Sequence, residues 1–85
     1  MKIEKPFYFI QQVSEITGLS KLVIRKWEER YQIVIPKRLE NGYRVYTEAD
    51  VNKILSVKNL TDQGYPVKQA AFYIQKIRTN PDQEY

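Results

Sequence analysis

The chain has 85 residues and carries 14 lysine and arginine side chains against 10 aspartate and glutamate side chains, a net charge of +4. This length predicts one small domain with a modest core. The absence of cysteine and histidine excludes disulfides, thiolate chemistry, imidazole general bases and most zinc sites. No segment is apolar enough for a secretion signal or a membrane span, so we expect a cytoplasmic protein.

Two short helices are predicted after an irregular lead-in over residues 1–7. Ile10, Val13 and Ile16 recur at helical spacing, and Thr17-Gly18 ends this first helix. Ser20 is a natural N-cap for the second helix, over residues 20–31, because its hydroxyl can accept a hydrogen bond from a first-turn amide.

The helix over residues 20–31 is amphipathic on a helical wheel. Its apolar face, which should pack in the core, carries Val23, Ile24, Trp27 and Tyr31. Its opposite face carries Leu22, Arg25, Lys26 and Glu29. Two short helices joined by a glycine-containing turn, the second polar on its outer face, predict a helix-turn-helix.

A basic β-hairpin is predicted over residues 36–46. Pro36 forbids a continued helix, and Asn41-Gly42 is a strong hairpin signal between flanks 37–39 and 43–46. Side chains alternate along a strand. One pair of the second flank should therefore pack on the body while the other points outward, the pairs being Tyr43 with Val45 and Arg44 with Tyr46.

Two more helices follow the hairpin. Thr47 caps the third, with Asp50 in capping-box position, and its buried residues should be Val51, Ile54, Leu55 and either Val57 or Leu60. Gly64 suits its end and Pro66 suits the first turn of the fourth. The fourth helix has an apolar stripe of Val67, Ala70, Ala71, Ile74 and Ile77, and Asn80-Pro81 closes it.

This order of elements predicts a fold class that is mainly α with a small β-hairpin wing, a winged helix-turn-helix of four helices. We expect one such domain over residues 1–80. A polar tail over residues 81–85 would be the place where a linker starts.

The excess positive charge lies on a single segment. Residues 20–46 hold 7 basic and 3 acidic side chains, 7 − 3 = +4, which leaves 7 of each sign for the remaining chain. Charge concentrated on one helix and one hairpin is typical of proteins that bind a polyanion.

Three pieces of the sequence also resemble one known family. They are TGLSKLVIRKWEERY, ENGYRVYTEADV and ILSVKNLTDQGYPV, within residues 13–67. Together they resemble the DNA-binding domain of the MerR family of bacterial transcription regulators. The recognition helix departs from the family's usual Arg-Tyr-Tyr-Glu and is similar to an Arg-x-Trp-Glu-x-Arg-Tyr subset, which includes light- and cobalamin-responsive repressors. In that subset a separate domain binds the cofactor, so the resemblance leaves the effector open and implies no cofactor for this chain.

The predicted site follows from the exposed face of the helix and from the hairpin. We expect Arg25 and Lys26 to reach guanine edges or phosphates in a major groove, and Lys21 to contact a phosphate. Two alternatives stay open for Leu22, packing in the core or contact with a thymine methyl group. For Tyr43 and Tyr46 the alternatives are packing in the core or contact with a phosphate. The full predicted set is Ser20, Lys21, Leu22, Arg25, Lys26, Lys37, Arg38, Tyr43, Arg44 and Tyr46.

Two pairs of side chains have less specific readings. Glu28 and Glu29 are adjacent on a helix and point about 100° apart, so we expect surface charges that partner Arg25 or Arg30. Phe72 and Tyr73 lie off the apolar stripe of the last helix. They should pack under residues 7–9, the alternative being contact with a partner or a linker segment.

The leading functional hypothesis is sequence-specific binding of duplex DNA for transcriptional regulation. The helix over 20–31 would enter a major groove and the hairpin over 36–46 would lie on the flanking backbone or minor groove. The resemblance implies a homodimer on an inverted repeat, formed through a segment beyond this domain, and an effector domain or partner protein. The alternatives are an architectural winged-helix binder similar to excisionases and a protein-binding winged helix; an enzyme is disfavoured because no serine has a base partner.

Overall fold

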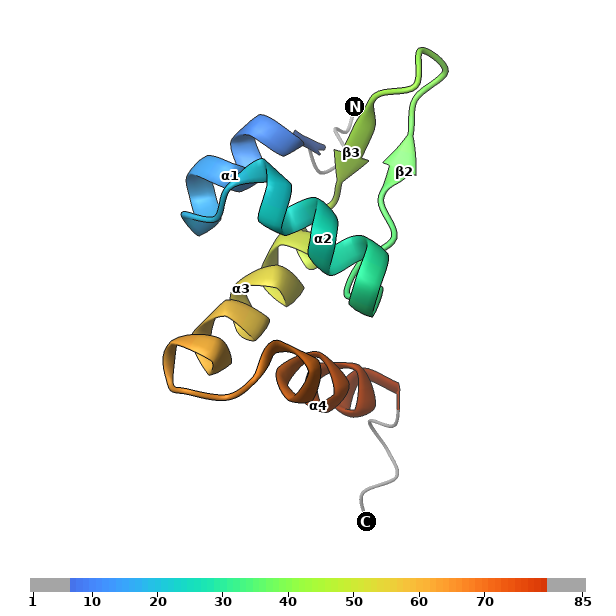
Figure 1. Cartoon of the computed structure of the whole chain (residues 1–85). Coiled ribbons are helices and arrows are strands. Elements are labelled where there is room, and N and C mark those ends of the chain that lie inside the picture. Colours follow the sequence, from blue (N-terminus) through green and yellow to red (C-terminus); the bar gives the residue numbers. More distant parts are fainter. Residues whose placement is uncertain (1–6, 80–85) are drawn as a thin grey trace.

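A computed structural model of the chain describes residues 7–79, with side chains described through residue 76. The elements are β1 (Tyr8–Phe9), α1 (Ile10–Thr17), α2 (Lys21–Tyr31), β2 (Lys37–Arg38), β3 (Arg44–Tyr46), α3 (Glu48–Asp62) and α4 (Val67–Thr79). Four helices and a small hairpin confirm the predicted winged helix-turn-helix (Figure 1). Asn80-Pro81 and the tail over 81–85 lie outside the described residues. None of the helices within residues 7–79 has the length and apolar character needed to cross a membrane.

The turn between α1 and α2 is held by local hydrogen bonds. Gly18 has φ 79°, a left-handed conformation that favours glycine, and its amide donates to the Ser14 carbonyl at 2.8 Å. The Ser14 hydroxyl donates to the Leu19 carbonyl at 2.6 Å. Ser20 then caps α2, its hydroxyl accepting from the Val23 amide at 3.1 Å, as the sequence predicts.

The sheet has three antiparallel strands in the order β1-β3-β2. Strand β3 is central, so Val45 pairs with Phe9 on one side and with Lys37 on the other. Strand β1 was not predicted from the sequence; it lies at the junction between the predicted irregular lead-in and the first helix. Two residues are too short to show a strand periodicity, and the strand exists because its backbone pairs with β3.

The predicted turn of the hairpin is confirmed. The Leu39 amide donates to the Tyr43 carbonyl at 2.9 Å, and the Gly42 amide donates to the Leu39 carbonyl at 2.8 Å. Gly42 has φ 92°, and the Asn41 side chain accepts from the Tyr43 amide at 3.1 Å. Asparagine followed by glycine favours this geometry because both tolerate tight turns.

The ends of α3 match the local sequence signals. Thr47 and Asp50 form a reciprocal capping box, with distances of 3.0 and 3.1 Å. At the other end the Gly64 amide donates to Thr61 and the Tyr65 amide donates to Leu60, which satisfies the last carbonyls of the helix. Strand β3 is followed directly by α3, so the hairpin is joined to a helix that contributes to the core.

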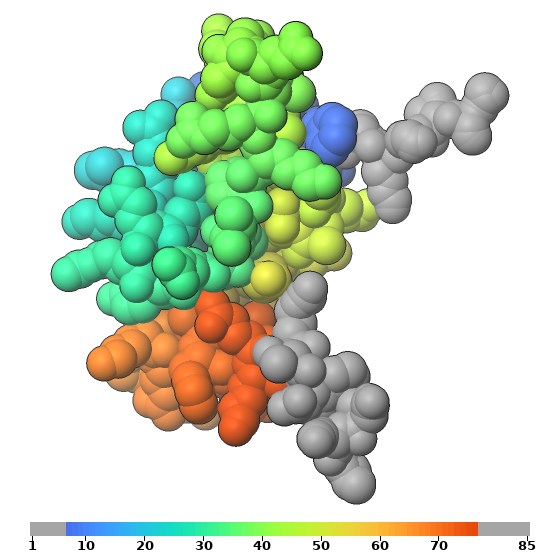
Figure 2. Space-filling view, turned by 90° about the vertical axis from the view of Figure 1, so that its right-hand side faces the viewer, coloured from blue at the N-terminus to red at the C-terminus, as the bar shows by residue number. Residues whose placement is uncertain are grey.

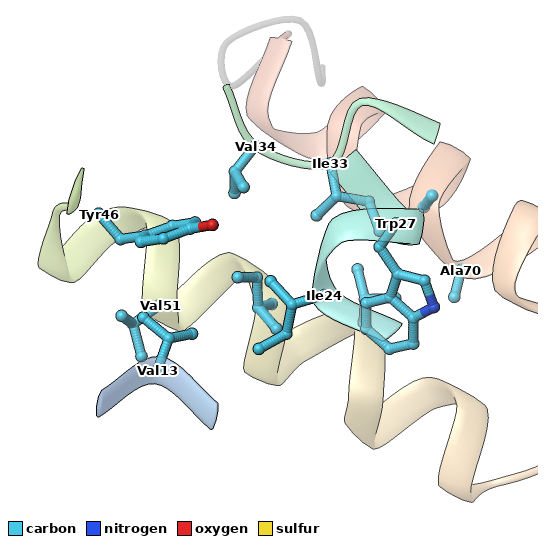
Figure 3. Close-up of a cluster of buried hydrophobic side chains, with 11 residues drawn as sticks. Val13, Ile24, Trp27, Ile33, Val34, Tyr46, Val51 and Ala70 are labelled. Carbon is cyan, nitrogen blue, oxygen red and sulfur yellow. The ribbon is translucent and has the colours of Figure 1, made fainter. Parts of the chain in front are cut away.

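The core lies between α2, α3 and α4, and is closed by α1 and β3 (Figure 3). Trp27 is 8% exposed and packs in it, which confirms the prediction for this residue. Of the two alternatives in α3, Val57 is fully buried, whereas Leu60 packs at the edge. Ile16, which shares the helical spacing of Ile10 and Val13, is exposed, because α1 presents Val13 and Thr17 to the core.

The prediction that Phe72 and Tyr73 pack under residues 7–9 is wrong. Both side chains are more than half exposed. Figure 2 shows α4 at the opposite end of the molecule from the hairpin. Phe9 instead meets the Tyr43 ring edge-on at a centroid distance of 6.1 Å. The aromatic side chains lie outside because α4 buries its small residues, Ala70 and Ala71, in the core.

Replacing Trp27 with alanine should lower the free energy of unfolding by about 3–5 kcal/mol, because it leaves a large cavity in the core. Chemical denaturation monitored by circular dichroism measures this loss. Lys26→Ala is the matched control on the same helix, and its exposed side chain should change stability by less than about 0.5 kcal/mol. A Trp27→Ala chain as stable as this control would contradict a core role.

Candidate nucleic-acid interface

The outer face of α2 is exposed along its length. Lys21, Arg25 and Lys26 all point away from the core, and Leu22 is 66% exposed, so the core alternative for Leu22 is wrong. Ser20 lies at the start of this face, where its hydroxyl already serves as the N-cap. The first turn of α2 contains no acidic residue, which leaves its positive dipole end available to an anion.

The C-terminal end of α2 is held by α4. The Gln75 side-chain amide donates to the carbonyls of Tyr31 and Gln32 at 3.0 and 3.1 Å. Gln32 ends the helix in a left-handed conformation with φ 52°. The last carbonyls of a helix need partners, so α4 both satisfies them and limits how far the outer face of α2 can tilt.

The hairpin adds a second exposed basic surface. Lys37 and Arg38 are exposed on β2, and Tyr43 is 61% exposed beside the turn. The Arg38 guanidinium donates to the Gly42 carbonyl at 3.2 Å, which orients it along the hairpin. Of the predicted alternatives for Tyr43, the structure supports the outward one.

An open groove of about 540 Å³ separates α2 from the hairpin. Three arginines line it, Arg25 from α2, Arg38 from β2 and Arg44 from β3, together with Tyr43. Glu29 also lines the groove and is its acidic member. Guanidinium groups match phosphate oxygens with paired hydrogen bonds, so this convergence favours a bound phosphate group.

Glu28 differs most from its prediction. It is 8% exposed rather than a surface charge, and its partners are on β3. The Tyr46 hydroxyl donates to Glu28 Oε2. Arg44 Nη1 lies 3.4 Å from Glu28 Oε1. A signal for this burial was present, because Glu28 follows the buried Ile24 by one helical turn and shares its face.

Tyr46 belongs to the core and not to the exposed surface. It is 0% exposed, so of its two predicted alternatives the core one holds, and its inclusion among the DNA-contacting residues is wrong. Burial and the hydrogen bond to Glu28 raise the pKa of its phenol above the ordinary value. Arg44 and Tyr46 share the face of β3 that meets α2. Val45 is also buried because β3 is the central strand, so strict inward and outward alternation fails.

Arg44 has two environments. Its side chain is 22% exposed, it pairs with the buried Glu28, and it also lines the groove. The predicted contact of Arg44 with DNA stays a prediction, to which the structure adds an internal partner. Among the described side chains, no three acidic residues come together in a way that could hold a metal ion.

The comparisons with known proteins identify the family. The family described as MerR HTH family regulatory protein matches residues 8–77. The chain belongs to the MerR family. It is 41% identical over 64 residues to the HTH-type transcriptional repressor CarH of Myxococcus xanthus, a match that covers 75% of this chain and 21% of that protein.

Two further likenesses agree with this membership. The HTH-type transcriptional regulator TnrA of Bacillus subtilis is 39% identical over 61 residues, which cover 72% of this chain and 54% of TnrA. The crystal structure of HiNmlR, a MerR family regulator lacking the sensor domain, bound to promoter DNA, has a similar fold. Its TM-score is 0.71 at 20% identity, covering 82% of this chain and 56% of that one. The chain thus spans about half or less of the length of these relatives.

The buried phenol predicts a specific alkaline behaviour. Because the folded-state pKa of Tyr46 lies above its ordinary value of 10.0, its stabilising contribution is present at neutral pH. It should be lost as the pH rises beyond that value. Ultraviolet titration should show the wild type and Tyr46→Phe alike up to the ordinary range and different by one phenol in stronger alkali. One fewer phenol ionising in Tyr46→Phe at or below the ordinary value would contradict the buried hydrogen bond.

Proposed function

We propose that this chain is the sequence-specific DNA-binding domain of a transcription regulator. The observation that carries the proposal is the groove in which Arg25, Arg38 and Arg44 converge between α2 and the hairpin. Exposed basic side chains lie on both of these elements. The domain that carries them belongs to the MerR family. The match to a MerR-family structure bound to promoter DNA supports the same role.

In the proposed complex α2 enters a major groove and the hairpin lies on the flanking backbone or minor groove. The major groove of B-DNA is about 12 Å wide and admits one helix. With about 1.5 Å of rise per residue, the 11 residues of α2 are long enough to lie along several base pairs. A hairpin adjacent to the helix can then reach the phosphates that border the groove.

The exposed side chains divide into two roles. Arg25, Lys26 and Leu22 would read base edges, since Arg and Lys match guanine and an apolar side chain matches the thymine methyl group. Lys21, Lys37 and Arg38 would contact phosphates, which position the domain and make affinity depend on salt. Ser20, Tyr43 and Arg44 would also contact phosphates, Tyr43 and Arg44 from within the groove.

We propose that binding is completed by a second copy on an inverted repeat. One domain of this size covers about one half-site, and two-fold symmetric dimers bind half-sites about one helical turn apart. An effector domain or partner protein would supply the signal.

We assign no enzymatic activity and no cofactor to these residues. A DNA-binding role implies a location in the cytoplasm, at the nucleoid. Family membership favours this regulator over an architectural binder.

The test is fluorescence anisotropy of the chain on duplex DNA from its own promoter, with a scrambled duplex as control, across a salt series. We expect tighter binding to the promoter and a steep dependence on salt. Arg25→Ala should weaken binding by about 1–3 kcal/mol without unfolding the domain.

Lys58→Ala is the matched control, because it removes the same charge from α3, where Lys58 pairs with Asp62 at 2.8 Å. It should change affinity far less than Arg25→Ala. Equal binding to both duplexes would refute sequence specificity. Equal losses in the two variants would show that net charge, and not the α2 surface, governs binding.

A further inference from the structure

We propose that Glu28 is a positioning residue for DNA binding, whose buried carboxylate fixes the hairpin against the recognition helix and aims Arg44 into the groove. This inference rests on the proposed function. It names a residue that would affect DNA affinity without contacting the duplex. Glu28 is 8% exposed and is absent from the residues that line the groove.

The geometry of the contact restrains two motions at once. One carboxylate oxygen accepts from the Tyr46 hydroxyl, and the other lies 3.4 Å from Arg44 Nη1. Arg44 and Tyr46 are two positions apart on β3 and so share a face of the strand. Two oxygens bound to two points on one strand restrain both its sliding and its rotation relative to α2.

The burial of the charge makes the restraint strong. A carboxylate removed from water is unfavourable unless it is paired and hydrogen-bonded. Shifts of the hairpin that break these contacts while Glu28 stays buried would leave the carboxylate both dry and unpaired, so such shifts are disfavoured.

Arg44 connects this restraint to the groove. A guanidinium has five N–H donors, and the pair with Glu28 engages one nitrogen. The remaining donors belong to a side chain that also lines the groove between α2 and the hairpin. Glu28 therefore holds the Arg44 fork in place before a phosphate arrives, which reduces the entropy lost on binding.

Glu28→Gln and Glu29→Gln form a matched pair that separates positioning from simple charge. The two residues are adjacent on α2, and each substitution removes one negative charge from the neighbourhood of a polyanion. Electrostatics alone predicts equal or tighter DNA binding for both variants. Positioning predicts that Glu29→Gln, which removes the acidic residue lining the groove, binds more tightly than the wild type, whereas Glu28→Gln binds about three- to tenfold more weakly.

The same affinity measurement in an Arg44→Met background tests whether Glu28 acts through Arg44. If Glu28 acts through Arg44, adding Glu28→Gln to Arg44→Met should change affinity by less than about twofold, because neighbours in one network are not additive. The double variant lacks the Arg44 guanidinium that Glu28→Gln alone would leave without its carboxylate, and its glutamine keeps an acceptor for the Tyr46 hydroxyl. It therefore serves for comparison with Arg44→Met even if Glu28→Gln alone unfolds.

All affinities are measured by anisotropy at a temperature at which circular dichroism shows each variant folded, on a duplex selected from a random library by the wild-type chain. Glu28→Gln binding as tightly as Glu29→Gln, or a further large loss in the Arg44→Met background, would overturn the positioning role. Failure of the wild type to select any duplex, or no effect of Arg25→Ala, would overturn the proposed function itself. The two failures are thus distinguishable.

Discussion

The arrangement of the interface depends on one buried carboxylate. Glu28 reaches from α2 to the central strand and engages Arg44 and Tyr46 together. Because β1 and β2 both pair with β3, this contact ties the whole sheet to α2. The strand continues into α3 through the Thr47 cap. The contact of Glu28 with β3 therefore also connects the recognition helix to α3.

The recognition helix is restrained at three places, and each uses polar atoms. Ser20 caps its start, Glu28 ties its middle to the hairpin, and Gln75 satisfies its last carbonyls from α4. Apolar packing of Ile24 and Trp27 supplies burial but is non-directional. The contacts of Glu28 and Gln75 join the helix to β3 and α4 and so limit the angle at which its outer face is presented. The basic side chains of that face are exposed to solvent.

Local signals were sufficient to predict the helices, their caps and the hairpin turn. Ser20, Thr47 with Asp50, and Asn41-Gly42 each act through hydrogen bonds within a few residues, so their geometry can be read from the sequence. Glu28 shares a helical face with Ile24, but its partner Tyr46 is 18 residues away, so only the packing of β3 on α2 reveals that the two side chains pair. Strand β1 and the exposure of Phe72 depend likewise on contacts between distant elements. The exposure of the basic side chains on α2 and β2 was predictable because charge and helical face are local properties.

The ion pair also explains how three arginines can share one groove in the free protein. Like charges brought together repel, and the repulsion grows where water is displaced. Glu28 offsets the charge of Arg44 from the buried side, which reduces this repulsion in the free domain. An apolar side chain at this position would bury surface but leave three guanidinium groups unopposed except by Glu29 at the open side. A carboxylate behind the groove thus stabilises the free domain while leaving its exposed surface positive.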